Sequence, residues 1–458
     1  MENKFKISVF TFSIILLTTL CLVLFFHQPP YIPLFISYIF TFNIAYINKY
    51  LFSDLLKMSV NGIKRGINVM IILLLIGALV ALWKQNGTLP ALIYYSSKYL
   101  KPENLLIMSF LVTSVISMIL GTAIGTASTI GIVIMGLSHG LGYPLPIVAG
   151  AIISGSFIGD RTSPLSGNVA LLSDMGEISH HNVIKSLFIT AIPVYIISAL
   201  LYYIIGLNIH IPPHDSYLNL RDIILSSYKI NPLLFISPFL IIVLAFLKVH
   251  TKTNLAIAVT ISYIISILNG YSPLFSLKVA LLGYSSNITE FKSIFSGGGM
   301  LSILPVIGVV SSATALSGIL EGTGIIKSVF NKAKNIKNSS TAYIITMLLS
   351  TLMAIIACNQ ALAVILPSRI MFDTFHHLDI KKEYMTRAIA DSGIVLAGII
   401  PWNLAAMLPS LALGVKVTSY LPYAFLNLIF PIVSIIIIFI ENKKEGLLSI
   451  KTKNQIQL

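Results

Sequence analysis

Long apolar segments follow one another along almost the whole chain, and short polar stretches separate them. A first series falls at about 7–26, 32–48, 67–84, 104–138, 144–172 and 183–206. A second series falls at about 231–247, 254–268, 300–320, 341–373, 388–412 and 420–440. A helix of about 20 apolar residues is long enough to cross the hydrocarbon core of a bilayer. The pattern therefore predicts an all-α polytopic membrane protein embedded in a lipid bilayer.

The composition agrees with this prediction. The hydrophobic set AVILMFWYC makes up 56% of the 458 residues and charged residues only 10%, whereas ordinary soluble domains carry about 25% charged residues. So few charges exclude a soluble enzyme, a secreted disulfide scaffold and a nucleic-acid-binding domain. The net charge of +14 comes from basic residues in short loops, so we expect no nucleic-acid partner. Cys21 and Cys358 show no metal or redox spacing, and we expect no cofactor.

Orientation in the membrane follows from the positions of lysine and arginine. Placing both termini in the cytoplasm puts most of the 30 basic residues into cytoplasmic loops, as the positive-inside rule requires. Segment 7–26 resembles a signal peptide, but His27-Gln28-Pro29-Pro30 offers no small-residue cleavage site after it. We therefore expect it to stay attached as the first helix of a multi-pass cell-membrane protein.

The two series of six segments indicate an internal duplication. Four pairs of positions match in order at offsets of about 235 to 238 residues: Gly62 with Gly297, Asn86-Gly87-Thr88 with Glu321-Gly322-Thr323, Pro164 with Pro401, and Pro193 with Pro431. We expect a first repeat at 1–207 and a second at 231–440. An extracellular inter-repeat loop at 208–230 and a cytoplasmic basic tail at 441–458 complete the predicted organisation.

Segments 104–138 and 341–373 are too long for one comfortable crossing at 1.5 Å rise per residue. Small and polar residues interrupt both, at 121–128 in the first and 357–361 in the second. The predicted orientation also requires each segment to return to the side from which it started. We therefore predict that each repeat contains about five transmembrane helices and one re-entrant hairpin. An odd number of crossings makes the two repeats inverted relative to each other.

The fifth segment of each repeat is interrupted too, around Pro164 and around Pro401. Proline removes a backbone donor and clashes with the preceding turn, so each helix is expected to break there. Unwound backbone at membrane depth is tolerated where it is buried in protein or lines a wet cavity. Broken helices at matching places in two inverted halves indicate the substrate site of a transporter.

Oxygen-bearing side chains gather at these four interruptions, and oxygen ligands suit a small hard cation. The candidate ion- or substrate-binding residues are Asp160, Ser163, Ser166, Asn168, Thr122, Thr126, Asn359, Gln360, Asp391, Trp402 and Asn403. Asp160 and Asp391 are the acid candidates, since an ionisable residue in an apolar segment is costly and usually functional. The alternatives are local ion pairs, of Asp160 with Arg161 and of Asp391 with Arg387 one helical turn earlier.

Several motifs carry a resemblance to a known family: Ser154-Gly155, Gly159-Asp160, Ser163-Pro164-Leu165-Ser166, Asn359-Gln360, Arg387, Asp391-Ser392-Gly393, Ile400-Pro401-Trp402-Asn403, Leu413-Gly414-Val415 and Tyr420–Phe425. With them the chain resembles the NhaC-type sodium/proton antiporter family of the ion-transporter group. The resemblance implies sodium and protons as substrates, with a sodium site at Asp160, Ser163 and Asn359. It also implies an elevator-like carrier with inverted repeats and paired hairpins. The family usually has Asp-Thr-Thr where this chain has Gly167-Asn168-Val169, which removes a carboxylate beside the break.

The sequence thus favours a secondary active antiporter in which sodium and protons compete for one buried carboxylate. The alternative is an antiporter or symporter of a small carboxylate or amino acid coupled to sodium or protons. Arg369 or Arg387 facing the cavity would favour it, because a carboxylate substrate suits a guanidinium fork. An intramembrane enzyme is disfavoured, since the chain has no His-Glu-x-x-His or nucleophile motif. The sequence leaves the oligomeric state open, including a homodimer.

Overall fold

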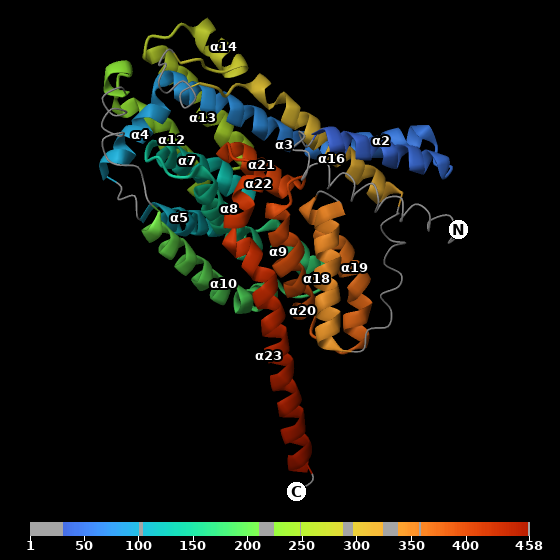
Figure 1. The fold of residues 1–458 in the computed structure, drawn as a ribbon. Helices are drawn as coiled ribbons and strands as arrows, with labels where there is room; N and C mark the ends of the chain where they lie inside the picture. Colours follow the sequence, from blue (N-terminus) through green and yellow to red (C-terminus); the bar gives the residue numbers. More distant parts are fainter. Residues whose placement is uncertain are drawn as a thin grey trace.

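The computed structural model describes residues 31–99, 104–209, 224–247, 249–286, 296–323, 338–356 and 359–456. The predicted helix at 7–26 and most of the predicted loop at 208–230 lie outside these ranges. Within the described residues the chain is almost entirely helical, with one isolated β-bridge between Tyr284 and Gly297. The structure therefore confirms the all-α class (Figure 1).

The described helices follow the chain in two groups. The first group contains α2 (Tyr31–Ile47), α3 (Phe52–Asn86), α4 (Thr88–Tyr99), α5 (Leu105–Leu120), α6 (Ala123–Thr126), the π-helical η2 (Ala127–Gly131), α7 (Ile132–Gly140), α8 (Leu145–Thr162), α9 (Gly167–Gly176) and α10 (His180–Asn208). The second begins with the 3₁₀-helical η3 (Pro232–Phe235), α12 (Ile236–Phe246), α13 (Thr251–Leu268), α14 (Pro273–Leu282), the 3₁₀-helical η4 (Met300–Ile303), α16 (Leu304–Gly322), α18 (Ser339–Ile356) and α19 (Gln360–His377). It ends with α20 (Lys382–Ile389), the π-helical η5 (Ala390–Ile394), the 3₁₀-helical η6 (Ala397–Ile399), α21 (Leu404–Leu413), α22 (Val417–Tyr420), the 3₁₀-helical η7 (Leu421–Tyr423) and α23 (Phe425–Ile456).

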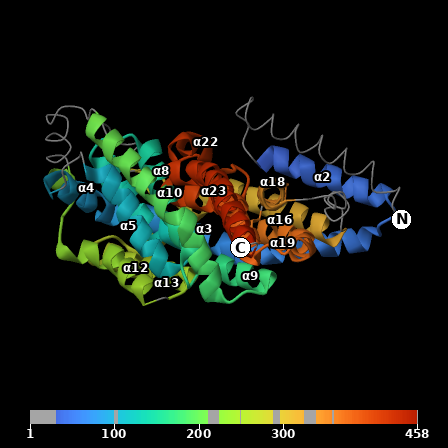
Figure 2. The ribbon, with the colours of Figure 1, turned by 90° about the horizontal axis from the view of Figure 1, so that it is seen from below.

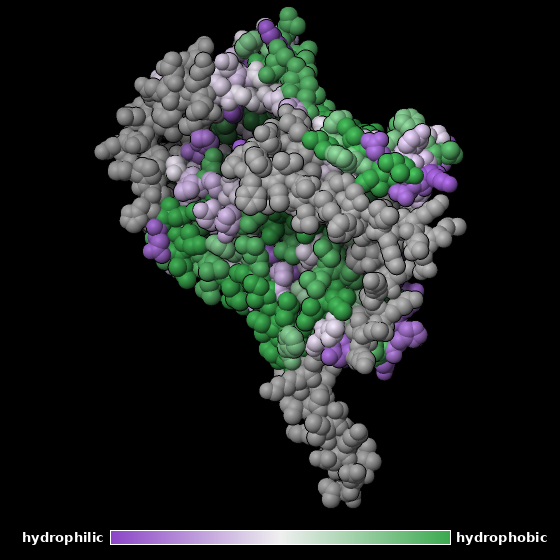
Figure 3. Space-filling view, turned by 45° about the vertical axis from the view of Figure 1, so that its right-hand side comes forward, coloured by the Kyte–Doolittle hydropathy of each residue, from purple (hydrophilic) through white to green (hydrophobic). Residues whose placement is uncertain are grey.

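Within the described residues, five stretches of helix are long and apolar enough to cross a membrane, namely α3, α10, α13, α16 with the preceding η4, and α18. Two further pairs pass the same test together but are bent, by 44° between 382–399 and α21 and by 52° between 417–423 and α23. One face of α10 carries large apolar side chains that are more than half exposed, among them Ile192, Leu200 and Ile204. Such an apolar face is more stable against lipid than against water. Figure 3 shows hydrophobic side chains over much of one side of the molecule. The chain is therefore a multi-pass membrane protein.

The helices form two layers. In the first, the long α3 packs along α16 and α13, with α2 on α16 and α14 on α3, and Figure 1 shows α3 running across this layer. A Cβ atom on Gly62 would lie 2.1 Å from the carbonyl oxygen of Thr314, so only glycine permits this close approach of α3 and α16. We call this set of helices the α3 layer.

The second layer contains both interrupted regions. Here α5 packs on α8, α10 on α23, and α18 on both α19 and α20. A Cβ atom on Gly159 would lie 2.0 Å from the carbonyl carbon of Ser117. The Ser117 hydroxyl instead accepts from the backbone N–H of Gly159 at 3.1 Å and donates to the carbonyl oxygen of Ser156. We call this set of helices, from α5 to α10 and from α18 to α23, the α8 layer.

A break falls at each of the four predicted interruptions, and residues 357 and 358 of the interruption at 357–361 lie outside the described ranges. The helix after α5 restarts at Ala123, beyond Gly121, whose φ of +68° suits glycine. After α18 the chain restarts as α19 at Gln360, and Figures 1 and 2 show these two helices side by side. Breaks at 163–166 and 400–403 separate α8 from α9 and η6 from α21. The π-helical segments η2 and η5 were not predicted from the sequence.

The helix bounds of the two halves coincide at one offset. Adding 237 carries 123–140 onto 360–377, 145–162 onto 382–399, and 167–176 onto 404–413. The order of helices and breaks is thus the same from α6 to α9 as from α19 to α21. The segment predicted as a basic tail is helical, since α23 continues through Ile456.

Candidate functional site

Asp160 lies in the last turn of α8, with 6% of its surface exposed. Its Oδ1 atom accepts a hydrogen bond from the backbone N–H of Ala123 at 3.2 Å. Its Oδ2 atom accepts from the side-chain amides of Asn168, at 3.0 Å, and Gln360, at 2.8 Å. All three donors are uncharged.

Each donor comes from the start of a different helix. Ala123 begins α6, Asn168 is the second residue of α9, and Gln360 begins α19. The first N–H groups of a helix have no partner within that helix and carry partial positive charge. The breaks therefore place three helix N-termini around one carboxylate.

Gln360 also joins the fourth interrupted segment to this group. Its Nε2 atom donates to the backbone carbonyl of Ile394 at 3.0 Å while it donates to Asp160. Ile394 is the last residue of the π-helical η5, and π-helical turns are frequent at functional sites. The structure thus brings together Asp160, Asn168 and Gln360, the group that we call the Asp160 cluster.

Other predicted site residues cap the helices that begin after the four breaks. Thr122, Ser166, Asn359 and Asn403 are the N-cap residues of α6, α9, α19 and α21, and each side-chain oxygen accepts from the backbone of its own helix. Thr126 donates to the carbonyl oxygen of Thr122 at 2.8 Å. N-cap side chains fix where a helix begins, so Thr122, Ser166 and Asn359 position the helix starts that carry Ala123, Asn168 and Gln360.

Ser163 holds the C-terminal end of α5, and Trp402 and Asn403 hold the C-terminal end of α18. Ser163 donates to the carbonyl oxygen of Met118 at 2.7 Å, in the last turn of α5. Trp402 and Asn403 donate to the carbonyl oxygens of Ile355 and Ala354, at 2.8 and 2.7 Å, in the last turn of α18. These carbonyls have no partner within their own helices. The hydrogen bonds found for Ser163 and Asn359 thus go to backbone atoms, and the sodium site assigned to them with Asp160 stays a prediction.

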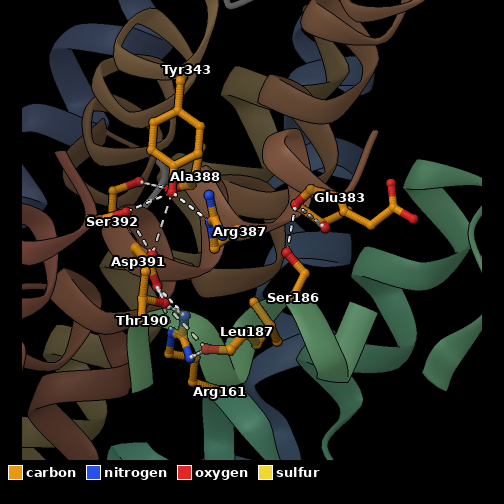
Figure 4. Close-up of polar contacts among 12 residues, drawn as sticks. Arg161, Ser186, Leu187, Thr190, Tyr343, Glu383, Arg387, Ala388, Asp391 and Ser392 are labelled. Atoms are coloured by element: carbon orange, nitrogen blue, oxygen red, sulfur yellow. Dashed lines mark hydrogen bonds and ion pairs between the residues drawn. The ribbon is translucent and has the colours of Figure 1, made fainter. Parts of the chain in front are cut away.

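Asp391 belongs to a different cluster. It is completely buried in η5, and its Oδ1 atom accepts from Arg161 Nε at 2.8 Å, from Arg161 Nη2 and from the Thr190 hydroxyl at 3.2 Å. Its Oδ2 atom accepts from the Ser434 hydroxyl at 2.6 Å. The Arg161 guanidinium lies 4.3 Å from the centre of the Phe430 ring. This ion pair, which joins the two halves of the chain, is shown in Figure 4.

The two local ion pairs considered as alternatives are therefore wrong. Arg161 pairs with Asp391 rather than with Asp160, because successive residues of a helix point about 100° apart and face different neighbours. Arg387 pairs with Glu441 of α23 through both terminal nitrogens and donates to the Tyr343 hydroxyl at 3.3 Å. Neither Glu441 nor the Arg161–Asp391 pair is predicted from the sequence. The available signal was a buried arginine, which requires an acid partner.

Charge balance separates the two carboxylates. Among the acidic side chains that the structure describes, only Asp160 and Asp391 are buried. Asp391 has Arg161 as its counter-ion, whereas Asp160 forms no ion pair within the described ranges. A buried carboxylate without a counter-ion takes up a proton or binds a cation. No group of three or more His, Cys, Asp or Glu side chains in that part of the chain could hold a metal ion.

Comparisons with known proteins agree with this geometry. The Na+/H+ antiporter family matches residues 1–207 and residues 182–441. The "Na(+)/H(+) antiporter NhaC" of Bacillus subtilis is 28% identical over 445 residues, which cover 95% of this chain and 98% of that protein. The "Malate-2H(+)/Na(+)-lactate antiporter" of the same organism is 27% identical over 426 residues, or 91% and 90% of the two chains. The "Arginine/ornithine antiporter ArcD" of Halobacterium salinarum is 28% identical over 398 residues, or 85% and 82%.

The helices, the breaks and the relatives lead to one assignment. The described residues contain apolar helices long enough to span a bilayer, and they contain a buried carboxylate whose hydrogen-bond network joins four interrupted segments. The relatives are named as antiporters, so the chain is a transporter and not an enzyme. The match covers both halves of the sequence. The chain belongs to the Na+/H+ antiporter family.

Proposed function

We propose that this protein exchanges sodium for protons, and that both ions bind at the Asp160 carboxylate. The observation that carries this proposal is the charge balance of the buried acids. Asp160 is the one buried carboxylate of the described residues without an ion-pair partner. A proton or a sodium ion neutralises it equally well, so the two ions exclude each other. A transport unit that moves only when the site is neutral then performs obligatory exchange.

The donors around Asp160 suit such a competition because they can change roles. Asn168 and Gln360 donate N–H groups to the carboxylate, but each amide also carries a carbonyl oxygen that a cation can use. Gln360 Nε2 lies between Asp160 Oδ2 and the Ile394 carbonyl. In our proposal, sodium takes this place between two oxygen atoms, and the amides turn their own oxygens toward it. Ser163, Asn359 and the other capping residues complete or position the shell.

The missing family carboxylate leaves room beside this site. A Cβ atom on Gly167 would meet no atom within 4 Å. Asn168, in the place of a threonine, donates directly to Asp160. We infer that this chain binds sodium with one carboxylate where typical family members have two.

The equal helix bounds at an offset of 237 support the finer architecture that we propose. It consists of two inverted repeats, at 1–207 and 231–440, each with about five transmembrane helices and a re-entrant hairpin. Both termini then lie in the cytoplasm, with the loop at 208–230 outside. A homodimer stays a prediction.

Exchange of a small carboxylate or amino acid is the alternative, and two relatives are named for such solutes. The arginines that could bind a carboxylate substrate are not available at the Asp160 cluster. Arg161 and Arg387 are held in ion pairs with Asp391 and Glu441, and Arg369 is exposed on α19. The neutral donors and the single free acid of the Asp160 cluster therefore favour a cation.

Everted membrane vesicles with a pH-sensitive dye test the proposal. Addition of sodium is expected to release protons from acid-loaded vesicles, whereas malate, lactate, arginine and ornithine are expected to release none. Potassium serves as the control for cation selectivity. Proton release driven by an organic solute and not by sodium would replace the proposal with the alternative.

A further inference from the structure

Asp160 and Arg161 are adjacent residues that serve different clusters. Asp160 faces α6, α9 and α19, where it meets the uncharged donors Ala123, Asn168 and Gln360. Arg161 faces η5 and α10, where it donates to Asp391 and to the carbonyl oxygen of Leu187. Two oppositely charged side chains on the same turn of α8 therefore point in different directions, toward two different clusters.

The Arg161 guanidinium is sealed from solvent. Its side chain has no exposed surface, and its Nη2 atom donates to the Thr190 hydroxyl at 2.7 Å. The guanidinium packs against the Phe430 ring on its other side. An arginine keeps its proton in proteins, so its positive charge is permanent and only one residue away from Asp160.

We propose that Asp391 is a positioning residue that cancels the charge of Arg161 and thereby keeps the sodium affinity of Asp160 high. The inference rests on the proposed function, in which Asp160 binds the ion. Asp391 does not bind the transported ion in this arrangement. Its carboxylate fixes the guanidinium on the α10 side, as Figure 4 shows, and removes the net positive field that would oppose a cation at Asp160.

The other charged groups near this pair are already balanced. The Tyr343 hydroxyl lies 3.5 Å from Asp391 Oδ2 and accepts from Arg387 on its other side. Arg387 is neutralised by Glu441, whose side chain is 23% exposed. Replacement of Asp391 by asparagine therefore leaves one buried positive charge, that of Arg161.

The test compares Asp391→Asn with the double variant Arg161→Gln/Asp391→Asn in everted vesicles. A unit charge about 10 Å away, at an effective dielectric constant of about 20, changes an affinity about tenfold. We expect Asp391→Asn to raise the sodium concentration for half-maximal exchange about tenfold, with a smaller change in the maximal rate. The double variant removes both charges and is expected to restore the wild-type concentration.

Two further variants isolate the charge of Arg161. Arg161→Gln is expected to keep a nearly wild-type half-saturating concentration, because a carboxylate without its counter-ion takes up a proton while an arginine cannot release one. Glu441→Gln is the matched control, since it also removes the acid partner of a buried arginine. Arg387 is not adjacent to Asp160 in the chain, and its partner Glu441 is partly exposed. The half-saturating sodium concentration is therefore expected to stay unchanged in Glu441→Gln.

Either of two results would overturn the inference. One is a double variant that is folded by size-exclusion chromatography but keeps the raised half-saturating concentration, which would make Asp391 an ion ligand. The other is an Asp391→Asn variant with unchanged half-saturation. If Asp391→Asn alone does not fold, the half-saturating sodium concentration of the double variant still tests the inference. Failure of the proposed function is visible separately, as sodium-driven exchange that persists in Asp160→Asn.

Discussion

The α8 layer contains two buried carboxylates whose surroundings differ in one respect. Asp391 is enclosed with an arginine, three hydroxyl donors and an aromatic ring, and its charge is balanced within the protein. Asp160 is enclosed with one backbone N–H and two side-chain amides, and its charge is not balanced. Both acids lie in interrupted helices, so position in the fold alone does not distinguish them.

From this difference we infer a separate task for each acid. A carboxylate that is paired with an arginine holds two parts of the protein together, and the Arg161–Asp391 pair joins α8 to η5 across the two halves of the chain. A carboxylate that is surrounded by neutral donors needs an ion from outside. Asn168 and Gln360 are half-buried and Gly167 is exposed, so we infer that such an ion reaches Asp160 past these residues.

The largest expected effect is the loss of exchange in Asp160→Asn. The neutral amide imitates the occupied state permanently, so no ion exchange remains at the site. Sodium-driven proton release in everted vesicles is expected to fall to background, with wild-type protein levels in the membrane. Exchange at the wild-type rate in this variant would remove Asp160 from the site.

The second effect is on stability, which we expect to fall when Asp391 is replaced by asparagine but not when Asp160 is. Asp391→Asn leaves Arg161 buried without a counter-ion, and breaking a buried pair from one side costs about 3–5 kcal/mol of unfolding free energy. Asp160→Asn removes an unbalanced charge and is expected to leave the thermal unfolding midpoint in detergent unchanged or higher. Equal destabilisation by both variants would contradict the comparison.

A smaller effect is expected when the missing family carboxylate is restored. Gly167→Asp places a second acid at the first residue of α9, in open space and at a favourable helix N-terminus. We expect the half-saturating sodium concentration to fall about tenfold, because a second charge strengthens the attraction for a cation. Gly167→Asn is the matched control and should leave it unchanged. A weaker sodium affinity in Gly167→Asp would contradict this account of the open space.

The smallest expected effect is the loss of one hydrogen bond to Asp391, which should lower stability without changing sodium affinity at Asp160. Thr190→Val removes a donor to Asp391 and an acceptor from Arg161 while it keeps the shape of the side chain. The unfolding free energy is expected to fall by about 1–2 kcal/mol, measured by thermal unfolding in detergent. Sodium half-saturation and maximal rate should stay at wild-type values. A raised half-saturating concentration would mean that Thr190 acts on the ion site.

Much of the fold could be predicted from the sequence because it depends on local chemistry. Apolar length predicts the spanning helices, and proline, glycine and polar residues mark the breaks near 163–166 and 400–403. The π-helical η2 and η5 could not be predicted, since a π-helical turn depends on packing against neighbouring helices rather than on a residue pattern.

The candidate site was predictable in its residue types but not in its pairings. The sequence predicts Asp160, Asn168 and Gln360 as site residues because they are polar residues at breaks, and the structure joins them. The sequence predicts the same role for Asp391 as for Asp160, because it shows that an acid lies in an apolar segment without showing which cation faces it. The pairing of Arg161 with Asp391, 230 residues away, depends on how the two halves pack.

The central claim is that one carboxylate exchanges a proton for sodium, and proton release on sodium binding tests it most directly. Purified protein in weakly buffered detergent solution, with a pH-sensitive dye, is titrated with sodium at a pH where the empty site is protonated. The account predicts that sodium binding releases protons from the wild-type protein and from Thr190→Val, and that Asp160→Asn releases none. Sodium binding without proton release in the wild type, or undiminished release in Asp160→Asn, would contradict the claim.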